Sequence, residues 1–404
     1  MGFGIGELIA ILLGMQIFGV APNPKAPTVD ASLRYAIADA DVVAQLDAAS
    51  VVPGNYKALL TLPAVPAVAR SPEAAKLAQQ LIDEVRGPHD MVAAMTGIDL
   101  ATDVADLTSF VQWVPQHDPN VVLAIHGKFT TAEVERIATL AQHVSNKTGG
   151  GEWVDLGNNY AFGLAQDGTL LAGTLPLVRD RVADGWKAPP HGAGTSLAAA
   201  AAVLAQKPVF ATVFAPSSAA RTDLLAKHEA DAPNVGTDLL QRGKVAAFEL
   251  FHDGMGWQWV DSSPAGLEAM AAISDGTIDL LRAAQIAPRG LGKIVLGGLE
   301  SYRGNPTIDA ILAYKADLAK LVDTYTGTGT FKAKVDKDPK ALKLSVRLTG
   351  PSLGQVVPFG VVVPLAIAGA LVMREPVQPR PPATVRATPS PALKVTPSGK
   401  KTSY

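Results

Sequence analysis

The chain has 404 residues, of which 48% are apolar and 18% are charged, and its formal net charge is −2. This length suffices for two or three domains. A nearly neutral chain has no overall field to attract nucleic acid, so no nucleic-acid partner is predicted. The sequence contains no cysteine, which excludes disulfides, thiolate nucleophiles, Cys-ligated zinc, iron–sulfur clusters and a lipid-modified N-terminal cysteine.

The first apolar run covers residues 8–21 and reads LIAILLGMQIFGVA. It is shorter than the roughly 20 residues of a membrane-spanning helix but suits the apolar region of a signal peptide. Extended back to Phe3, the run becomes long enough for an uncleaved anchor. Residues 1–21 are therefore predicted to be a signal peptide or an N-terminal membrane anchor, with a buried helix as the alternative. Residues 22–34 begin with Pro22, Pro24 and Pro27 and are interpreted as a linker.

The start of the chain also resembles the Tat translocase small-subunit family. The resemblance lies in the residues FGIG at 3–6, ELI at 7–9 and FG at 18–19. That family continues with a basic amphipathic helix, whereas this chain continues with VAPNPKAP at residues 20–27. The resemblance is therefore confined to a short N-terminal membrane helix, and a translocase-like role is one alternative function.

The body of the chain alternates strand-like and helix-like segments. In the first part, Ser71 and Pro72 give a helix start, and Thr130 can cap a second helix. Asp167-Gly168 predicts a hairpin turn. The expected strands are residues 41–46, 109–114, 120–125, 160–165 and 169–173, and the expected helices are residues 71–86, 131–143 and 176–186.

The second part repeats much of this order. The predicted helices are residues 197–206, 264–273 and 306–323, and the predicted strands are residues 209–215, 244–252, 257–261, 329–335 and 342–349. Strand, turn, strand, helix occurs at residues 109–143 and again at residues 244–273. We interpret this as a degenerate duplication, with α+β repeats at residues 35–190 and 191–350. Hairpins mixed with helices favour the α+β class, with antiparallel sheets that carry helices on one face.

The second apolar run covers residues 356–373 and holds 18 uncharged residues. Its length predicts a transmembrane helix at residues 355–373, and a buried strand pair is the alternative. The remaining residues, 374–404, are rich in proline and carry six basic side chains against Glu375. We expect a disordered basic tail on the cytoplasmic side of the membrane and therefore a body on the outer side.

Histidine–aspartate pairs are the strongest catalytic candidates in the sequence. His117-Asp118 and His252-Asp253 lie in tight connections between strands, and His89-Asp90 follows Gly87-Pro88. Such a pair can orient an imidazole for base catalysis or bind a metal. Neither ligand spacing nor a known motif accompanies them, so we interpret all three as turn residues, and His126 as a polar residue that ends a strand. No catalytic, metal-binding or cofactor-binding residue is predicted.

Four side chains form a candidate binding surface. Trp257 and Trp259 are two residues apart and share one face of a strand. If His252 opposes Trp257 in the hairpin, Leu250 opposes Trp259, and Phe248 continues the same face. The stripe predicts either an aromatic binding platform or one side of a core.

Several segments resemble uncharacterised bacterial envelope proteins with a duplicated α+β domain. They are residues 96–100 (TGIDL), 107–110 (LTSF), 121–129 (VVLAIHGKF), 160–162 (YAF) and 167–174 (DGTLLAGT). That resemblance implies the fold and no activity. We expect a non-enzymatic protein of the bacterial inner membrane, with a periplasmic binding or scaffolding body that contacts the membrane and an envelope protein. The alternatives are a subunit of a larger membrane complex and a hydrolase-type enzyme.

Overall fold

The computed structural model describes residues 10, 18–20, 23, 25–143, 145–148, 151–193, 195–228, 235–326 and 332–350. Among these residues, no helix combines the length and the apolar character needed to cross a bilayer. The transmembrane helix expected at residues 355–373 and the tail at residues 374–404 lie outside the described residues. So does the N-terminal run, apart from Ala10 and residues 18–20.

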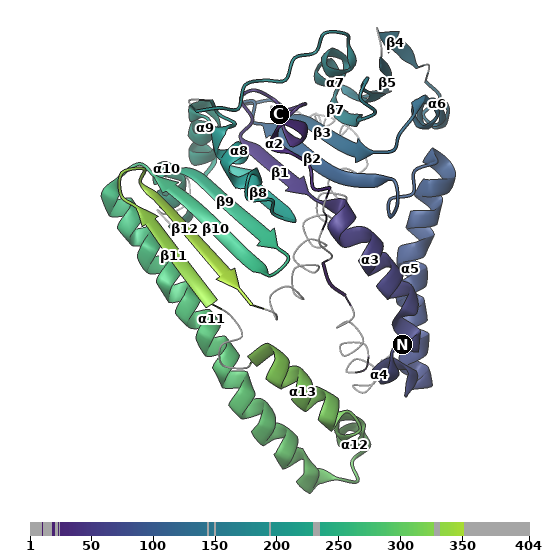
Figure 1. Ribbon diagram of the computed structural model, residues 1–404, viewed down its shortest axis with the longest axis vertical. Coiled ribbons are helices and arrows are strands. Elements are labelled where there is room, and N and C mark those ends of the chain that lie inside the picture. The colour runs from purple at the N-terminus through teal and green to yellow at the C-terminus, as the bar shows by residue number, and fades with distance from the viewer. Residues whose placement is uncertain are drawn as a thin grey trace, which may run out of the picture. The chain divides into compact units, whose positions relative to one another are not determined.

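One antiparallel sheet of 12 strands organises the described chain, in the order β11-β12-β10-β9-β8-β1-β2-β3-β7-β6-β5-β4 (Figure 1). This confirms the α+β class and the antiparallel pairing. The strands are β1 (Val42–Leu46), β2 (Val104–Gln112), β3 (Asn120–Gly127), β4 (Asn146–Thr148), β5 (Gly151–Gly157), β6 (Tyr160–Leu164), β7 (Leu170–Thr174), β8 (Phe210–Phe214), β9 (Gly243–Phe251), β10 (Gly254–Asp261), β11 (Lys332–Asp338) and β12 (Lys343–Thr349).

Helices connect the strands. The α-helices are α2 (Val29–Ser32), α3 (Ala48–Thr61), α4 (Pro66–Ala69), α5 (Pro72–Thr96), α6 (Thr131–Leu140), α7 (Leu175–Val182), α8 (Ala198–Leu204), α9 (Ser218–His228), α10 (Val235–Arg242), α11 (Pro264–Gly298), α12 (Pro306–Leu312) and α13 (Lys315–Thr326). Short 3-10 helices are η2 (Leu62–Ala64) and η3 (Leu299–Tyr302).

The two halves of the chain meet where β1 pairs with β8. Ala44 lies opposite Thr212 in this antiparallel pair, near its centre. On one side the strands follow the order β1-β2-β3-β7-β6, and on the other β8-β9-β10-β12-β11. The first side ends with two further strands, β5 and β4, which have no counterpart on the second side, and the remaining five strands follow the same order on both sides of one continuous sheet.

Helices cover both faces of the sheet, so the expectation of helices on one face is wrong. On one face, Phe110 and Val213 pack against α7 and α8. On the other, residues of α3 and α6 pack on the first half, and Leu267 and Ile278 of α11 pack on the second. In Figure 1, α8 lies in front of the sheet and α11 lies behind β10, β12 and β11. Strands buried on both faces need apolar side chains at successive positions, which explains runs such as VVLAI in β3.

The local sequence accounts for several helix starts. The Ser71 side chain accepts a hydrogen bond from the Ala74 backbone N–H, and Pro72 occupies the first helical position of α5. Thr130 and Glu133 form a complete capping box at the start of α6. These two predicted caps are confirmed.

Several predicted boundaries are wrong. The helix expected to end at Arg86 continues through Gly87 and Pro88 to Thr96, and the helix expected to end at Ile273 continues to Gly298. The helix expected at residues 306–323 is divided into α12 and α13. Within residues 22–34, interpreted as a linker, Thr28 caps α2 and Leu33 is fully buried.

Candidate functional site

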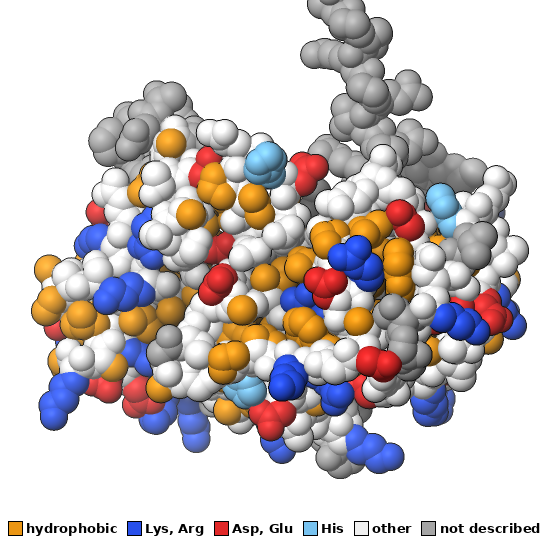
Figure 2. Space-filling model, turned by 90° about the horizontal axis from the view of Figure 1, so that it is seen from above, with side chains coloured by type: hydrophobic (Ala, Val, Ile, Leu, Met, Phe, Trp, Pro, Cys, Tyr) orange, Lys and Arg blue, Asp and Glu red, His pale blue; other side chains and the backbone are white. Residues whose placement is uncertain are grey.

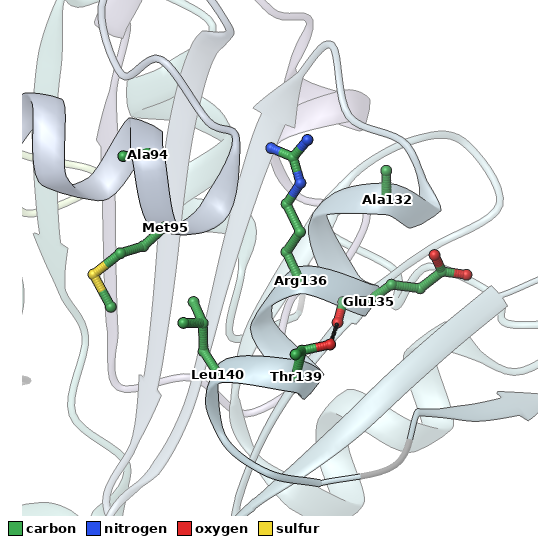
Figure 3. A pocket seen from close by; sticks show the side chains of 7 residues that line it. All are labelled: Ala94, Met95, Ala132, Glu135, Arg136, Thr139 and Leu140. Atoms are coloured by element: carbon green, nitrogen blue, oxygen red, sulfur yellow. Dashed lines mark hydrogen bonds between the residues drawn. The ribbon is translucent and has the colours of Figure 1, made fainter.

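A groove of about 490 Å³ lies between the C-terminal part of α5 and α6 (Figure 3). Its apolar lining includes Met95 and Leu140, whose side chains are 46% and 47% exposed. Met91, one helical turn before Met95, is 57% exposed. Large apolar side chains left this open to solvent mark a surface that another molecule can cover. The full lining is Ala94, Met95, Ala132, Glu135, Arg136, Thr139 and Leu140.

Arg136 gives the groove a positive charge. Its guanidinium projects from α6 toward the end of α5 (Figure 3), where Gly97 ends the helix in the left-handed conformation with φ +82°. A side chain at Gly97 would collide with Arg136 Nη1. A cation beside the C-terminus of α5 is favourable because the carbonyl groups there carry partial negative charge. Glu135 lines the same groove, so a bound segment meets charges of both signs.

His89 belongs to the helix that forms this groove, and its interpretation as a turn residue is wrong. It lies within α5 and stacks on Tyr56 of α3 with ring centroids 4.6 Å apart. Its Nε2 lies 3.1 Å from Asp99 Oδ1, and its Nδ1 lies 3.2 Å from Asp90 Oδ1. Burial opposes the charge on Asp99, but hydrogen bonds from the Ala101 backbone and from His89 hold its pKa below the usual range. The imidazole therefore joins α3, α5 and the loop that follows α5.

His117 and His252 occupy the strand connections that the sequence predicts. His117 lies in the turn between β2 and β3, and His252 lies in the turn between β9 and β10. Within the described chain, no hydrogen bond or ion pair joins either imidazole to another side chain. Asp253 instead pairs with Arg347 across the sheet, at 2.8 Å. Nor do the described residues contain a group of three or more His, Asp or Glu side chains placed to hold a metal ion.

The closest histidine–carboxylate pair joins two residues that are distant in sequence. His126 Nδ1 lies 2.8 Å from Asp106 Oδ1, between β3 and β2. Asp106 is 4% exposed, and His126 Nε2 is buried with no hydrogen-bond partner among the described residues. A carboxylate that orients an imidazole in this way is half of a general-base arrangement. No hydroxyl of the described residues bonds to Nε2, and the hydrogen bond between the two side chains links β2 to β3.

A second buried polar group lies on β9. The Glu249 carboxylate is 3% exposed and accepts hydrogen bonds from Gln258 Nε2 at 2.5 Å and from Gln206 Nε2 at 3.3 Å. Burial raises the pKa of Glu249, although Gln258 and Arg347 oppose the rise. Gly256 lies between Glu249 and Arg347 in the strand register. These contacts join β9, β10 and the end of α8.

The hairpin turn after β6 carries a third polar group. Tyr35 donates a hydrogen bond to Asp167 Oδ1 at 2.8 Å, and Arg34 Nε lies 3.3 Å from Asp167 Oδ2. Burial raises the pKa of Tyr35 well above its usual value, and the Asp167 contact raises it further. Burial opposes the charge on Asp167, but the hydrogen bonds from Tyr35 and Thr169 keep its pKa below the usual range. This group fastens the segment before β1 to the hairpin.

The four residues of the candidate binding surface share one face, as the sequence predicts. Their pairing differs from the expectation, because Trp257 lies opposite Phe248 and Trp259 lies opposite Ala246. Trp259 is 9% and Leu250 2% exposed. Trp257 Nε1 donates to Ser274 Oγ of α11 at 3.0 Å, and Trp259 Nε1 donates to Asp261 at 2.9 Å. The stripe is therefore largely a packing surface for α11. Phe248, at 36% exposure, is its most exposed side chain.

No pattern in the sequence indicates the groove itself. Met95 and Leu140 line one groove because α5 continues past Pro88 and packs against α6. No family model matches the chain, and no match is found among curated proteins or solved structures.

Proposed function

We propose that the chain is a non-enzymatic, membrane-held binding protein that receives an apolar segment of a partner protein in the groove between α5 and α6. The observation that carries this proposal is the open groove of about 490 Å³, in which the exposed side chains of Met95 and Leu140 lie beside Glu135 and Arg136. Its volume lies within the usual range of binding sites. Methionine side chains adapt to partners of different shape, which suits the binding of a peptide or helix.

The charges on the molecule fit a protein partner. Glu135 and Arg136 place opposite charges in the groove, so a partner segment with charged residues of both signs finds partners at its edges. In Figure 2, acidic and basic side chains are interspersed among apolar ones, and no field of one sign covers that face. A mixed surface of this kind does not attract a nucleic-acid backbone.

The membrane attachment rests on the sequence. Residues 1–21 and 355–373 are proposed to reach the inner membrane of a bacterium, with the body in the periplasm and the basic tail in the cytoplasm. Gly350, the last described residue, donates its backbone N–H to the Asp253 carbonyl at 2.8 Å. The second apolar run begins at residue 356, shortly after Gly350 in the sequence.

Photo-crosslinking from the groove tests the binding proposal. A photoreactive amino acid at Met95 is expected to yield a specific adduct with one protein in intact cells. The same amino acid at Tyr160 serves as the matched control, because both side chains are 46% exposed. Leu140→Asp should remove the adduct without changing the melting temperature, since Leu140 is exposed. Equal adducts from positions 95 and 160, or none from position 95, would contradict the proposal.

A further inference from the structure

An apolar stripe runs along the side of α11 that faces away from the sheet. Ile278 is buried against the sheet, and Leu267 and Leu296 are buried within about 20° of it around the helix. Leu280, Ile294 and Ile273 lie between about 160° and 220° from Ile278 around the helix. Their exposed fractions are 69%, 72% and 46%. The stripe is thus on the opposite side from the buried face.

The stripe repeats every seven residues and alternates large with small residues. One series takes every seventh residue from Ile273 and contains Leu280, Ala287 and Ile294. A second series, three residues further along, contains only small residues, namely Gly276, Ala283, Gly290 and Gly297. A seven-residue apolar repeat is the pattern of a helix that packs lengthwise on another helix.

The two series are complementary to each other when a second copy of α11 runs antiparallel. If position 280 of one copy faces position 290 of the other, then 273 faces 297, 276 faces 294 and 283 faces 287. Each large side chain of the stripe then meets a glycine, and the two alanines meet each other. Small residues opposite large ones allow helix backbones to approach closely.

We propose that α11 is a homodimerisation helix that packs antiparallel on α11 of a second copy of this chain. The interface is isologous, so one contact set is used twice and the assembly closes at two copies. The α5–α6 groove lies on other helices, and a dimer therefore presents two grooves.

The mass of the full chain in detergent tests association. The wild type is expected to have twice the 41.9 kDa mass of one chain. Leu280→Asp and, separately, Ile294→Asp should halve that mass, while Val85→Asp, at a side chain of α5 that is 47% exposed, should leave it unchanged. Circular dichroism should show that all variants are folded, since these side chains are exposed. A wild type with the mass of one chain, or a dimer that survives both α11 substitutions, would overturn the proposal.

Cysteine crosslinking tests the orientation, because the natural chain has no cysteine. A short bismaleimide should join Leu280→Cys to Gly290→Cys when the two variants are mixed. Neither variant alone should crosslink, because identical positions are about 15 Å apart along the helix axis in this pairing. Self-crosslinking of Leu280→Cys would show parallel helices and refute the antiparallel arrangement. Binding of a monomeric wild type to vesicles through Leu280 would show that the stripe contacts lipid instead.

Discussion

Single buried polar residues carry much of the connection between elements. Arg181 of α7 is 5% exposed, and its guanidinium donates to the carbonyl groups of Tyr35, Ala36 and Leu177. Burial lowers the pKa of Arg181 to about 10, which leaves it charged at neutral pH. A buried cation is tolerated here because carbonyl oxygens replace water around it.

Glu249→Gln is expected to raise the free energy of unfolding at pH 7 by ~1 kcal/mol. Burial raises the pKa of Glu249 in the folded state, so the folded protein favours the protonated form. The stability contributed by this group is present below its ordinary pKa of 4.5 and is lost as the pH rises through the raised value. The variant should therefore lose less stability than the wild type between pH 4.5 and neutrality in urea unfolding.

Glu135→Gln, in which an exposed carboxylate is changed in the same way, is the control and should follow the wild-type pH profile. A Glu249→Gln variant that is less stable than the wild type at pH 7 would show that the attraction of Arg347 outweighs burial.

Asp167→Asn is expected to reduce stability at pH 7 by about 1–2 kcal/mol, because the variant loses the charge that Tyr35 and Arg34 contact. The folded-state pKa of Asp167 is below its ordinary value. The stability that the Asp167 carboxylate contributes is therefore present above its ordinary pKa. This stability is lost as the pH falls through the lower pKa of the folded state. Urea denaturation should show that the difference in free energy of unfolding between variant and wild type is smaller at pH 3 than at pH 7. Asp180→Asn, which changes an exposed carboxylate, should have the same free energy of unfolding as the wild type at both pH values.

At the scale of elements, most strands and helix starts could be predicted from the sequence, whereas helix ends could not. Pro88 signals a helix end by its missing N–H, yet α5 continues because His89 stacks on Tyr56 of α3. Ser274 and Gly276 give a similar signal in α11, but Ser274 accepts a hydrogen bond from Trp257 and is buried. In both helices a tertiary contact outweighs the local preference.

The groove depends on the extension of α5 past Pro88, and the cover over the aromatic face of β10 depends on the extension of α11 past Ile273. The aromatic face of β10 follows from strand alternation and was predictable, but its cover by α11 was not. The Asp106–His126 pair also escaped prediction. The two residues lie directly opposite each other in the regular register of the β2–β3 pair, but the strand predicted at residues 109–114 leaves Asp106 outside it, because β2 begins at Val104.

Two glycines, Gly97 at the C-cap of α5 and Gly54 inside α3, should respond oppositely to alanine. Gly97→Ala is expected to lower the free energy of unfolding by about 1–2 kcal/mol, because φ is +82° there and a methyl group collides with Arg136. Gly54→Ala should raise it by up to about 1 kcal/mol, because Gly54 is inside α3 with no neighbouring atom within 4 Å of an added Cβ. Urea unfolding of both variants measures the difference. Equal effects would contradict the C-cap geometry.

At the scale of the molecule, the β1–β8 pair makes the two halves interdependent. The Asp41 carboxylate accepts backbone hydrogen bonds from Trp113 in the first half and from Ser217 in the second, both at 2.6 Å. The core on one face also mixes residues of both halves, such as Val43 with Val213. The two halves therefore share one sheet and one core on this face.

Residues 25–190 expressed alone are expected to aggregate or self-associate. Without the second half, β1 becomes an edge strand with unpaired backbone groups, and apolar side chains normally covered by α8 and β8 are exposed. Coexpression with residues 191–350 should restore a soluble complex, measured by size-exclusion chromatography. A first half that is monomeric and cooperatively folded by itself would show that the halves are independent domains.

Accessibility of single cysteines in spheroplasts tests the central claim, that a binding body outside the cytoplasm is held by apolar terminal segments. A membrane-impermeant maleimide is predicted to label Tyr160→Cys, on the exposed side chain of β6, in intact spheroplasts. It should label Ser398→Cys, in the basic tail, only after lysis. Protection of position 160 until lysis, or labelling of position 398 before it, would contradict the account.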